Sequence, residues 1–275
     1  MVVFTHMLIK NLLTVYVRKN VLSFVVGVVI GVVAGLIGVG GGEFRIPALT
    51  YLTSSSMTVV ASSNLLIGFF TVFVSFLLRL LKGLASSSSI LFGAYLSVGS
   101  IVGAYLGALM SGKFSNRALR ILVIAYLLIV GLRFTFEPLI GEVSETLLFQ
   151  ENVIPIYLIC FGFLVSVLSA MFGVAGGEMR IPILIMAFGL GAKLAGTASL
   201  FASIATVGIG FLQHYRMGHF EVRFTWIALF MTIGSILGTI LGTFLVVTLD
   251  DRYLKLILGV VLIAATLRFT AGLNK

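Results

Sequence analysis

The sequence predicts an all-α integral membrane protein of about eight transmembrane helices, arranged as two homologous repeats of four spans each (4+4). The first observation is composition: of 275 residues, 60% are hydrophobic and 10% are charged, and the mean hydropathy is +1.20. A soluble domain carries about 25% charged residues, so lipid must solvate much of this surface. The second is that the apolar residues fall into runs long enough to cross a bilayer. The third is a glycine-rich motif that interrupts two of these runs, at residues 38–47 and 173–182.

The charge of the chain fits a membrane location better than a nucleic-acid partner. The formal net charge is +9, from 18 basic and 9 acidic residues. The basic residues stand mostly between the apolar runs, where juxtamembrane anchors lie, so we exclude nucleic acid as a partner. The single cysteine, Cys160, excludes an internal disulfide and any metal site built from several cysteines. We expect no cofactor and no bound metal.

The chain begins with an interfacial segment, residues 1–20, which precedes the first transmembrane repeat, residues 21–136. Lys10, Arg18 and Lys19 lie in this segment and favour a cytoplasmic N-terminus, because basic residues gather on the cytoplasmic side of a membrane.

Four apolar runs form the spans of this repeat, expected at residues 21–37, 58–78, 90–110 and 119–136. In the first run Gly27, Gly31 and Gly35 are four residues apart and share one helix face. Such a stripe of small residues lets two helix backbones approach closely in lipid. A further apolar piece at residues 46–52 is too short to cross a bilayer by itself.

An acidic linker, residues 137–152, follows the first repeat. It holds four of the nine acidic residues, namely Glu137, Glu142, Glu145 and Glu151. The pattern of the first half then returns 135 residues further on, so that Gly38 is matched by Gly173 and Arg117 by Arg252. The second repeat is expected at residues 153–270, with a C-terminal tail at 271–275. Duplicated membrane folds place their site at the interface between repeats, near the midplane.

The motif reads GVGGGEFRIP in the first half and GVAGGEMRIP in the second. Consecutive glycines allow positive φ angles and can turn successive N–H groups to one side. Pro47 and Pro182 suit the first turn of a short helix. Each copy therefore predicts a broken or re-entrant segment near the midplane, with the positive end of a helix dipole facing the break.

Arg45 and Arg180 are the candidate anion ligands of this segment. A guanidinium can bind an oxyanion through two parallel hydrogen bonds. An ionised side chain inside a bilayer costs about 3 kcal/mol or more, so two charges at matching positions indicate a function. The backbone N–H groups of the motif glycines are further candidate donors to the substrate, and these residues are Gly41, Gly42, Gly176 and Gly177.

Glu43 and Glu178 allow two interpretations, which the sequence leaves open. Each carboxyl group can carry a coupling proton, since burial and a neighbouring arginine shift its proton affinity in opposite directions. Alternatively, an acid and an arginine two residues apart in an extended segment point the same way. They would then neutralise each other and brace the broken helix.

Four uncharged polar residues stand near the start of the spans that follow the motif. Ser63 and Asn64 belong to the first half, and Thr197 and Ser199 to the second. They can offer neutral donors to a substrate, or they can cap the N-termini of the two helices. Both interpretations stay open.

The residues described above resemble the sulfite exporter family of TauE/SafE-like membrane transporters. The resemblance rests on the glycine-rich element ending in proline, on the small and polar residues 61–64 and 196–200, and on His214 before Gly218. A glycine-striped span and a basic, apolar last helix complete it. It implies transport of small sulfur-containing anions such as sulfite or sulfonates. The chain departs from the family pattern in its Glu-x-Arg pairs, and in Arg79, which stands where the second half has His214.

The function predicted from the sequence is secondary transport of a small oxyanion, a sulfur-containing one by the resemblance, through alternating access at the repeat interface. The alternative is an anion channel that uses the same site without coupling. No catalytic constellation of His, Cys or carboxylates stands out, so we do not expect an enzyme. The partners are the anion and the lipid bilayer of the cell (inner or plasma) membrane. Proton coupling, the oligomeric state, and parallel or inverted repeats are left open.

Overall fold

The computed structural model describes residues 2–113, 117–140 and 151–271. Within these ranges the chain forms ten α-helices and two short 3₁₀ turns, and it contains no strand. The first half contributes α1 (Val2–Ile37), α2 (Gly42–Thr53), α3 (Met57–Leu81), α4 (Ser87–Met110) and α5 (Arg117–Ile140). The second half contributes η1 (Glu151–Val153), α6 (Ile154–Phe172), α7 (Gly177–Met186), α8 (Ala192–Arg216), η2 (Val222–Phe224), α9 (Thr225–Thr248) and α10 (Asp251–Ala271).

Six stretches of helix are long and apolar enough to cross a membrane, judged by length and composition over the described residues. They are Val17–Ile37, Met57–Leu81, Ser87–Met110, Ile154–Phe172, Ala192–Arg216 and Thr225–Thr248. The protein is thus an all-helical, multi-pass membrane protein. The remaining expected spans fall in α5 and α10, whose side chains are described only in part, so the count of eight stays a prediction.

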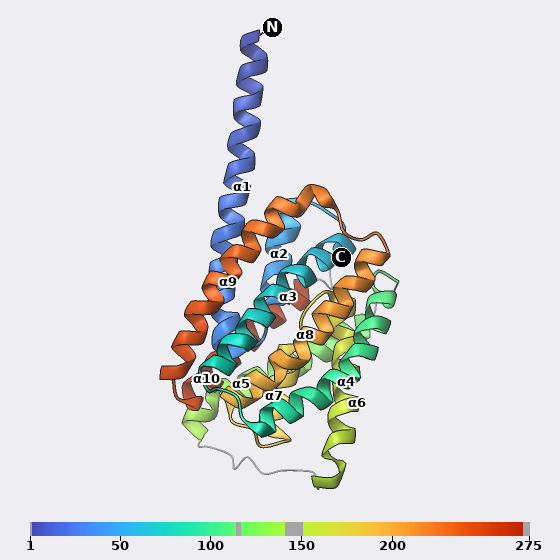
Figure 1. Ribbon diagram of the computed structural model, residues 1–275, viewed down its shortest axis with the longest axis vertical. Helices are drawn as coiled ribbons and strands as arrows, with labels where there is room; N and C mark the ends of the chain where they lie inside the picture. Colours follow the sequence, from blue (N-terminus) through green and yellow to red (C-terminus); the bar gives the residue numbers. More distant parts are fainter. Residues whose placement is uncertain (1, 114–116, 141–150, 272–275) are drawn as a thin grey trace.

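Helix α1 is continuous over 36 residues, and its N-terminal part projects from the bundle (Figure 1). The expected interfacial segment and the expected first span therefore lie on one helix, with no break near residue 20. The acidic linker falls mostly outside the described residues. Its first residue, Glu137, is buried in α5 and forms an ion pair with Lys255 of α10 at 3.1 Å.

Several helix boundaries of the two halves follow the same offset of 135 residues. Helix α3 spans Met57–Leu81 and α8 spans Ala192–Arg216, while α2 and α7 begin at Gly42 and Gly177. Packing follows the same correspondence: α1 packs along α9 and α4 along α6, whereas α3 packs on α8 and α5 on α10 (Figure 1). Each half thus packs its first helix against the third long helix of the other half, and the halves interlock.

Glycines bring the backbones of these exchanged pairs into contact. A Cβ atom on Gly31 of α1 would collide with the Ser235 carbonyl oxygen, and one on Gly238 of α9 with the Val28 carbonyl oxygen. The same relation holds between α4 and α6, where a Cβ on Gly103 would collide with the Phe163 carbonyl oxygen. Close approach of this kind supplies the packing energy that the hydrophobic effect cannot provide within lipid.

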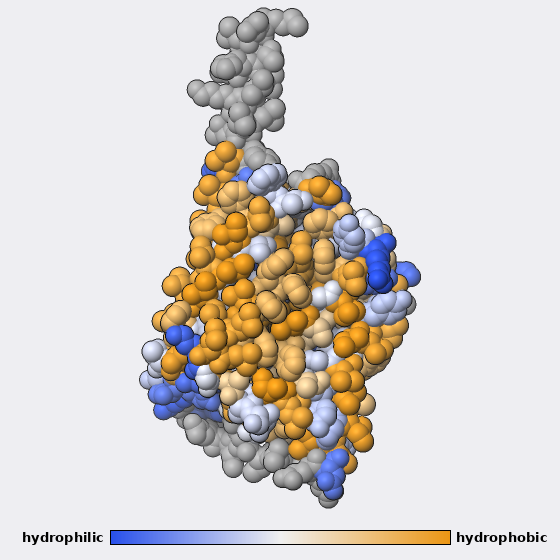
Figure 2. All heavy atoms as spheres, in the orientation of Figure 1, coloured by the Kyte–Doolittle hydropathy of each residue, from blue (hydrophilic) through white to orange (hydrophobic). Residues whose placement is uncertain are grey.

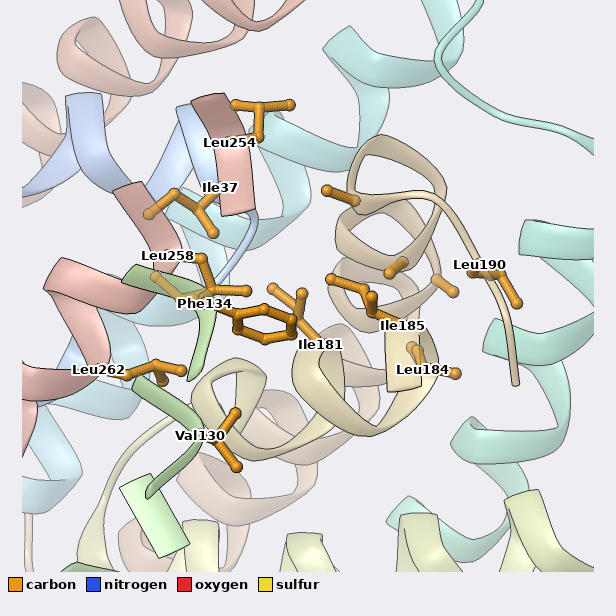
Figure 3. Packing of buried hydrophobic residues seen from close by; sticks show 14 of the residues in the cluster. Ile37, Val130, Phe134, Ile181, Leu184, Ile185, Leu190, Leu254, Leu258 and Leu262 are labelled. Carbon is orange, nitrogen blue, oxygen red and sulfur yellow. The ribbon is translucent and has the colours of Figure 1, made fainter. Parts of the chain in front are cut away.

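Apolar side chains cover both the outside and the interior of the bundle. Figure 2 shows hydrophobic residues over most of the visible face, with hydrophilic residues mainly towards its ends. Exposed examples include Val98, Ile129, Leu164 and Leu241. Inside, one cluster joins the end of α1 to α5, α7 and α10, where residues such as Ile37, Phe134, Ile181 and Leu258 lie close together (Figure 3). This cluster packs α7 against the last helices of both halves.

Candidate functional site

Two breaks in the helices form the frame of the site, and glycine conformation creates both. Gly40 and Gly41 have φ angles of 86° and 69°, and Gly176 has φ of 85°. These are left-handed values that other residues adopt only with strain. Gly41 and Gly176 are the N-cap residues of α2 and α7, which begin at once with Gly42 and Gly177.

The prediction that the two prolines stand in the first turn of each short helix is wrong. Pro47 and Pro182 were expected in the first turn, but they lie inside α2 and α7, five residues after the first helical residue. The reason is that the left-handed glycine, not the proline, ends the break and starts the helix. Each proline instead withholds an N–H group from the carbonyl four residues before it, which belongs to Glu43 or Glu178.

The two breaks touch each other across the interface between the halves. A Cβ atom on Gly40 would stand 2.7 Å from the Cβ of Ala175. One on Gly42 would stand 3.2 Å from the Cα of Val174, and one on Gly177 would stand 2.5 Å from the Cα of Val39. A side chain at Gly40, Gly42 or Gly177 would therefore collide with the other copy of the motif.

Arg45 is fully buried, and its guanidinium is held by neutral groups of its own half. Nε donates to Oδ1 of Asn64 at 2.9 Å, and Nη1 donates to the Thr71 hydroxyl at 3.2 Å. Nη2 donates to the carbonyl oxygen of Gly40 at 2.7 Å. The arginine thus reaches back over the first turn of α2 and ties that helix to the break before it.

Arg180 is equally buried and repeats this arrangement with more partners. Nη1 donates to the carbonyl oxygen of Ala175 at 2.8 Å, the counterpart of Gly40, and to the Ser203 hydroxyl at 3.0 Å. Nη2 donates to the hydroxyls of Thr206 at 2.6 Å and Ser166 at 2.7 Å, with Ser100 of the first half at 3.4 Å. In this conformation neutral acceptors of the protein surround both guanidinium groups.

Glu43 and Glu178 are also fully buried, in the first turns of α2 and α7. That position suits a carboxylate, because the N-terminal end of a helix dipole is positive. Each acid attracts the arginine of its own motif electrostatically. The expectation that acid and arginine point the same way is wrong in its premise. The segment is helical rather than extended, and residues two apart on a helix point to different sides.

Asn64 connects the two halves. Besides accepting from Arg45, its Nδ2 donates to the carbonyl oxygens of Gly42 at 3.0 Å and of Gly173 at 2.6 Å. Among the predicted polar residues, Asn64 is the one that the structure places against an arginine of the motif.

The other three predicted polar residues are buried and are not among the hydrogen-bond partners of Arg45 and Arg180, although the Thr197 hydroxyl accepts from Nη1 of Arg79 at 3.4 Å. The Thr197 hydroxyl donates to the Leu84 carbonyl at 2.8 Å, and the Ser199 hydroxyl has no hydrogen-bond partner among the described residues. The N-cap interpretation of this group is wrong. The N-caps of α3 and α8 are Ser56 and Gly191, so Ser63, Asn64, Thr197 and Ser199 stand one to two turns inside the helices.

Sequence reasoning missed the hydroxyl residues that hold the arginines. Thr71 and Thr206 occupy matching positions in α3 and α8, and Ser199, Ser203 and Thr206 are spaced as one face of a helix. A polar stripe of helical period within an apolar span was the available signal.

Arg79 was recognised only as a departure from the family pattern, yet it is fully buried and makes contacts in both halves. It donates to the carbonyls of Gly35 and Leu36 at the end of α1, at 3.1 and 3.0 Å, and to that of Lys193 at 2.9 Å. His214, its counterpart, lies 3.4 Å from the carbonyl oxygen of Ala170 near the end of α6. Each side chain therefore contacts the end of the broken helix in its own half.

The sequence is similar to those of known membrane transporter proteins. The family model described as "Sulfite exporter TauE/SafE" matches residues 1–134 and 158–275. The "Probable membrane transporter protein YunE" of Bacillus subtilis is 27% identical over 265 residues, covering 88% of this chain and 95% of that protein. The "Probable membrane transporter protein MJ0441" of Methanocaldococcus jannaschii is 24% identical over 259 residues, covering 88% and 91%. No solved structure gives a significant match. Since the family model covers nearly the whole of both halves, including both copies of the motif, the chain belongs to the sulfite exporter TauE/SafE family.

Proposed function

We propose that this protein is a secondary transporter that moves a small oxyanion across the cell membrane by alternating access between its two halves. The substrate class follows the family description, so sulfite and sulfonates are the first candidates. The observation that carries the proposal is the meeting of two broken helices, each with a buried arginine and a buried glutamate, inside a lipid-facing bundle. Ionisable groups inside a membrane protein mark pathways for ions and substrates, and half-helix ends commonly form the sites of transporters.

The contacts of the arginines suggest how binding drives the conformational change. In the described conformation, Arg45 and Arg180 donate to the carbonyls of Gly40 and Ala175, which belong to the breaks themselves. An oxyanion is a stronger acceptor for a guanidinium than a neutral carbonyl or hydroxyl. A substrate that displaces the carbonyl oxygen of Gly40 or Ala175 from its arginine would release the broken segment from the short helix that follows it. The anion would thus bind one conformation better than the other, as any ligand-driven change requires.

The motif glycines retain their proposed role as substrate donors. Gly41 and Gly176 cap the short helices and Gly42 and Gly177 begin them, and the first N–H groups of a helix have no partner within it. Glu43 and Glu178 lie beside these donors, and we propose that they carry the coupling proton when the arginine contacts are exchanged. Under this proposal Glu43→Gln alters the pH dependence of transport, and an unchanged pH profile would remove that glutamate from coupling.

Uptake into proteoliposomes tests the proposal directly. Purified protein would be assayed with radiolabelled sulfite, a sulfonate and a small carboxylate at two pH values. We expect saturable sulfite uptake that Arg45→Ala and Arg180→Ala abolish while both variants still insert into membranes. The exposed Lys113→Ala serves as the matched loss of a surface charge and should leave uptake unchanged. Wild-type flux in both arginine variants would refute the anion site. Accelerated exchange against sulfite inside the vesicles would separate a carrier from a channel.

A further inference from the structure

The two arginine sites differ in how many donors the protein itself occupies. Each terminal nitrogen of a guanidinium carries two N–H groups. In Arg180, Nη1 makes two hydrogen bonds and Nη2 makes three, so both terminal nitrogens are fully used, and only Nε has no hydrogen-bond partner among the described residues. In Arg45, Nη1 and Nη2 make one hydrogen bond each, to Thr71 and to Gly40. The described residues therefore leave one N–H on each terminal nitrogen of Arg45 without an acceptor.

Substitutions at matching positions produce this difference. Ser203 and Ser166, which bind Arg180, correspond to Gly68 and Gly31 in the first half at the offset of 135 residues. Gly68 faces the guanidinium, because a Cβ atom there would stand 3.3 Å from Nη2 of Arg45. A serine at this position would offer the hydroxyl that Arg45 lacks.

A second observation concerns the third long helix of each half. The hydroxyl of Ser100 in α4 contacts Arg180 and also donates to the carbonyl oxygen of Gly162 at 3.4 Å. Its counterpart, Ser235 in α9, is fully buried, and its hydroxyl has no hydrogen-bond partner among the described residues. Ser235 packs against Gly31, the position that corresponds to Ser166. Beside Gly31 the second half thus contributes an unused hydroxyl, that of Ser235, while Arg45 of the first half has unused guanidinium donors.

We infer that the two halves have divided their roles: Arg45 contacts the transported oxyanion, whereas Arg180 fixes the second half, and Gly68 is the positioning residue that keeps Arg45 available. This inference rests on the proposed transport function. Leaving a buried N–H without an acceptor is unfavourable, and an oxyanion supplies acceptors to both terminal nitrogens of one guanidinium. To bind the same anion, Arg180 would first have to break contacts with several hydroxyl groups.

The sites of Arg45 and Arg180 share most of their contacts, so the difference between them can be assigned to a few residues. Both arginines donate to the carbonyl of a break residue and to a threonine at matching positions, Thr71 and Thr206. Both have a glutamate in the same turn of helix. The difference lies in the serine hydroxyls, which single substitutions can exchange.

A pair of reciprocal variants tests the division of roles, with KM and maximal rate for sulfite uptake measured separately in proteoliposomes. Gly68→Ser gives Arg45 the missing acceptor and is expected to raise KM about tenfold, because a neutral hydroxyl then competes with the anion. Gly68→Ala adds nearly the same volume without an acceptor, so it measures the effect of volume by itself, and its KM should stay well below that of Gly68→Ser. Ser203→Ala removes an acceptor from Arg180 and should also keep KM within about twofold.

A second arm uses the arginines themselves and decides the matter if the Gly68 variants do not yield folded protein. Arg45→Lys should raise KM, because lysine cannot bind two oxygens in parallel, while Arg180→Lys should mainly lower the melting temperature and raise KM much less than Arg45→Lys does. The inference is overturned if Ser203→Ala or Arg180→Lys raises KM as much as the variants at Arg45 and Gly68, or if Gly68→Ser folds and leaves KM unchanged. A wild-type protein that shows no saturable sulfite uptake would refute the transport function itself, a failure visible before any variant is compared.

Discussion

Replacing Asn64 by alanine should destabilise the protein strongly, because this side chain joins the two breaks. The substitution removes three hydrogen bonds: the one accepted from Nε of Arg45 at 2.9 Å, and those donated to the carbonyls of Gly42 at 3.0 Å and Gly173 at 2.6 Å. Asn64 is 2% exposed, so water cannot readily replace any of them. The loss separates the first broken helix from the second.

The size of the effect follows from the kind of each bond. Hydrogen bonds between side chains inside membrane proteins average about 0.6 kcal/mol and reach about 1.7 kcal/mol. A bond to a charged donor such as Arg45 is worth about 1.5–3 kcal/mol, and leaving that donor buried without an acceptor adds to the loss. We therefore expect Asn64→Ala to lower the free energy of unfolding by about 2–4 kcal/mol. For a chain of this size that corresponds to a melting temperature lower by about 5–15 °C.

Thermal unfolding of the purified protein in a mild detergent measures this shift. Asn64→Asp should be at least as harmful as Asn64→Ala, because it keeps the acceptor for Arg45 but turns an oxygen towards two carbonyl oxygens. Ser199→Ala is the matched control, since Ser199 occupies the corresponding position with a buried hydroxyl that has no hydrogen-bond partner among the described residues. A melting temperature of Asn64→Ala within about 2 °C of the control would refute the claim that Asn64 holds the breaks together.

Three further predictions concern the contacts between helices. Gly238→Ala should prevent close packing of α1 on α9 and lower the yield of folded protein. Gly208→Ala, where the added Cβ meets only ordinary contact distances, should leave the yield unchanged. Size-exclusion profiles in detergent compare the two variants. Glu137→Gln, which removes the ion pair between Glu137 and Lys255, should lower the melting temperature, while exchanging both residues for apolar ones of similar size should restore most of it. Arg79→Ala, which frees carbonyls in both halves, should lower the melting temperature by about 5 °C or more, and an unchanged value would show that those contacts contribute little.

Much of this architecture could be predicted from the sequence, because lipid imposes simple rules on apolar chains. The long apolar runs lie in helices, since backbone groups in a bilayer must be satisfied within the segment. The stripe of Gly27, Gly31 and Gly35 marks a helix contact, and the two copies of the glycine motif meet as expected. The offset of 135 residues between the halves reappears in the bounds of α3 and α8 and in the first residues of α2 and α7.

Other features depended on information that no local pattern carries. Pro47 was expected at a helix start, but the φ angles of Gly40 and Gly41 decide where the helix begins, and glycine permits many values. Glu43 and Arg45 were expected on the same side of an extended segment, but the segment is helical, so the two side chains point to different sides. The acceptors of Arg180 come from α4, α6 and α8, and which helices surround a side chain depends on tertiary packing.

The interlocked packing of the two halves also constrains the order in which the protein can be made. Helix α1 packs along α9, and the Thr239 hydroxyl donates to the carbonyl of Gly31 across 208 residues of sequence. At translation rates of about 5–20 residues per second, α1 waits in the membrane for roughly 10–40 s before its partner exists. During that time the glycine face of α1 has only lipid or insertion factors to contact. A ribosome that stalls after the first half would therefore leave a helix whose intended neighbour has never been synthesised. Two separately encoded halves would have to meet in the same membrane before either could assemble.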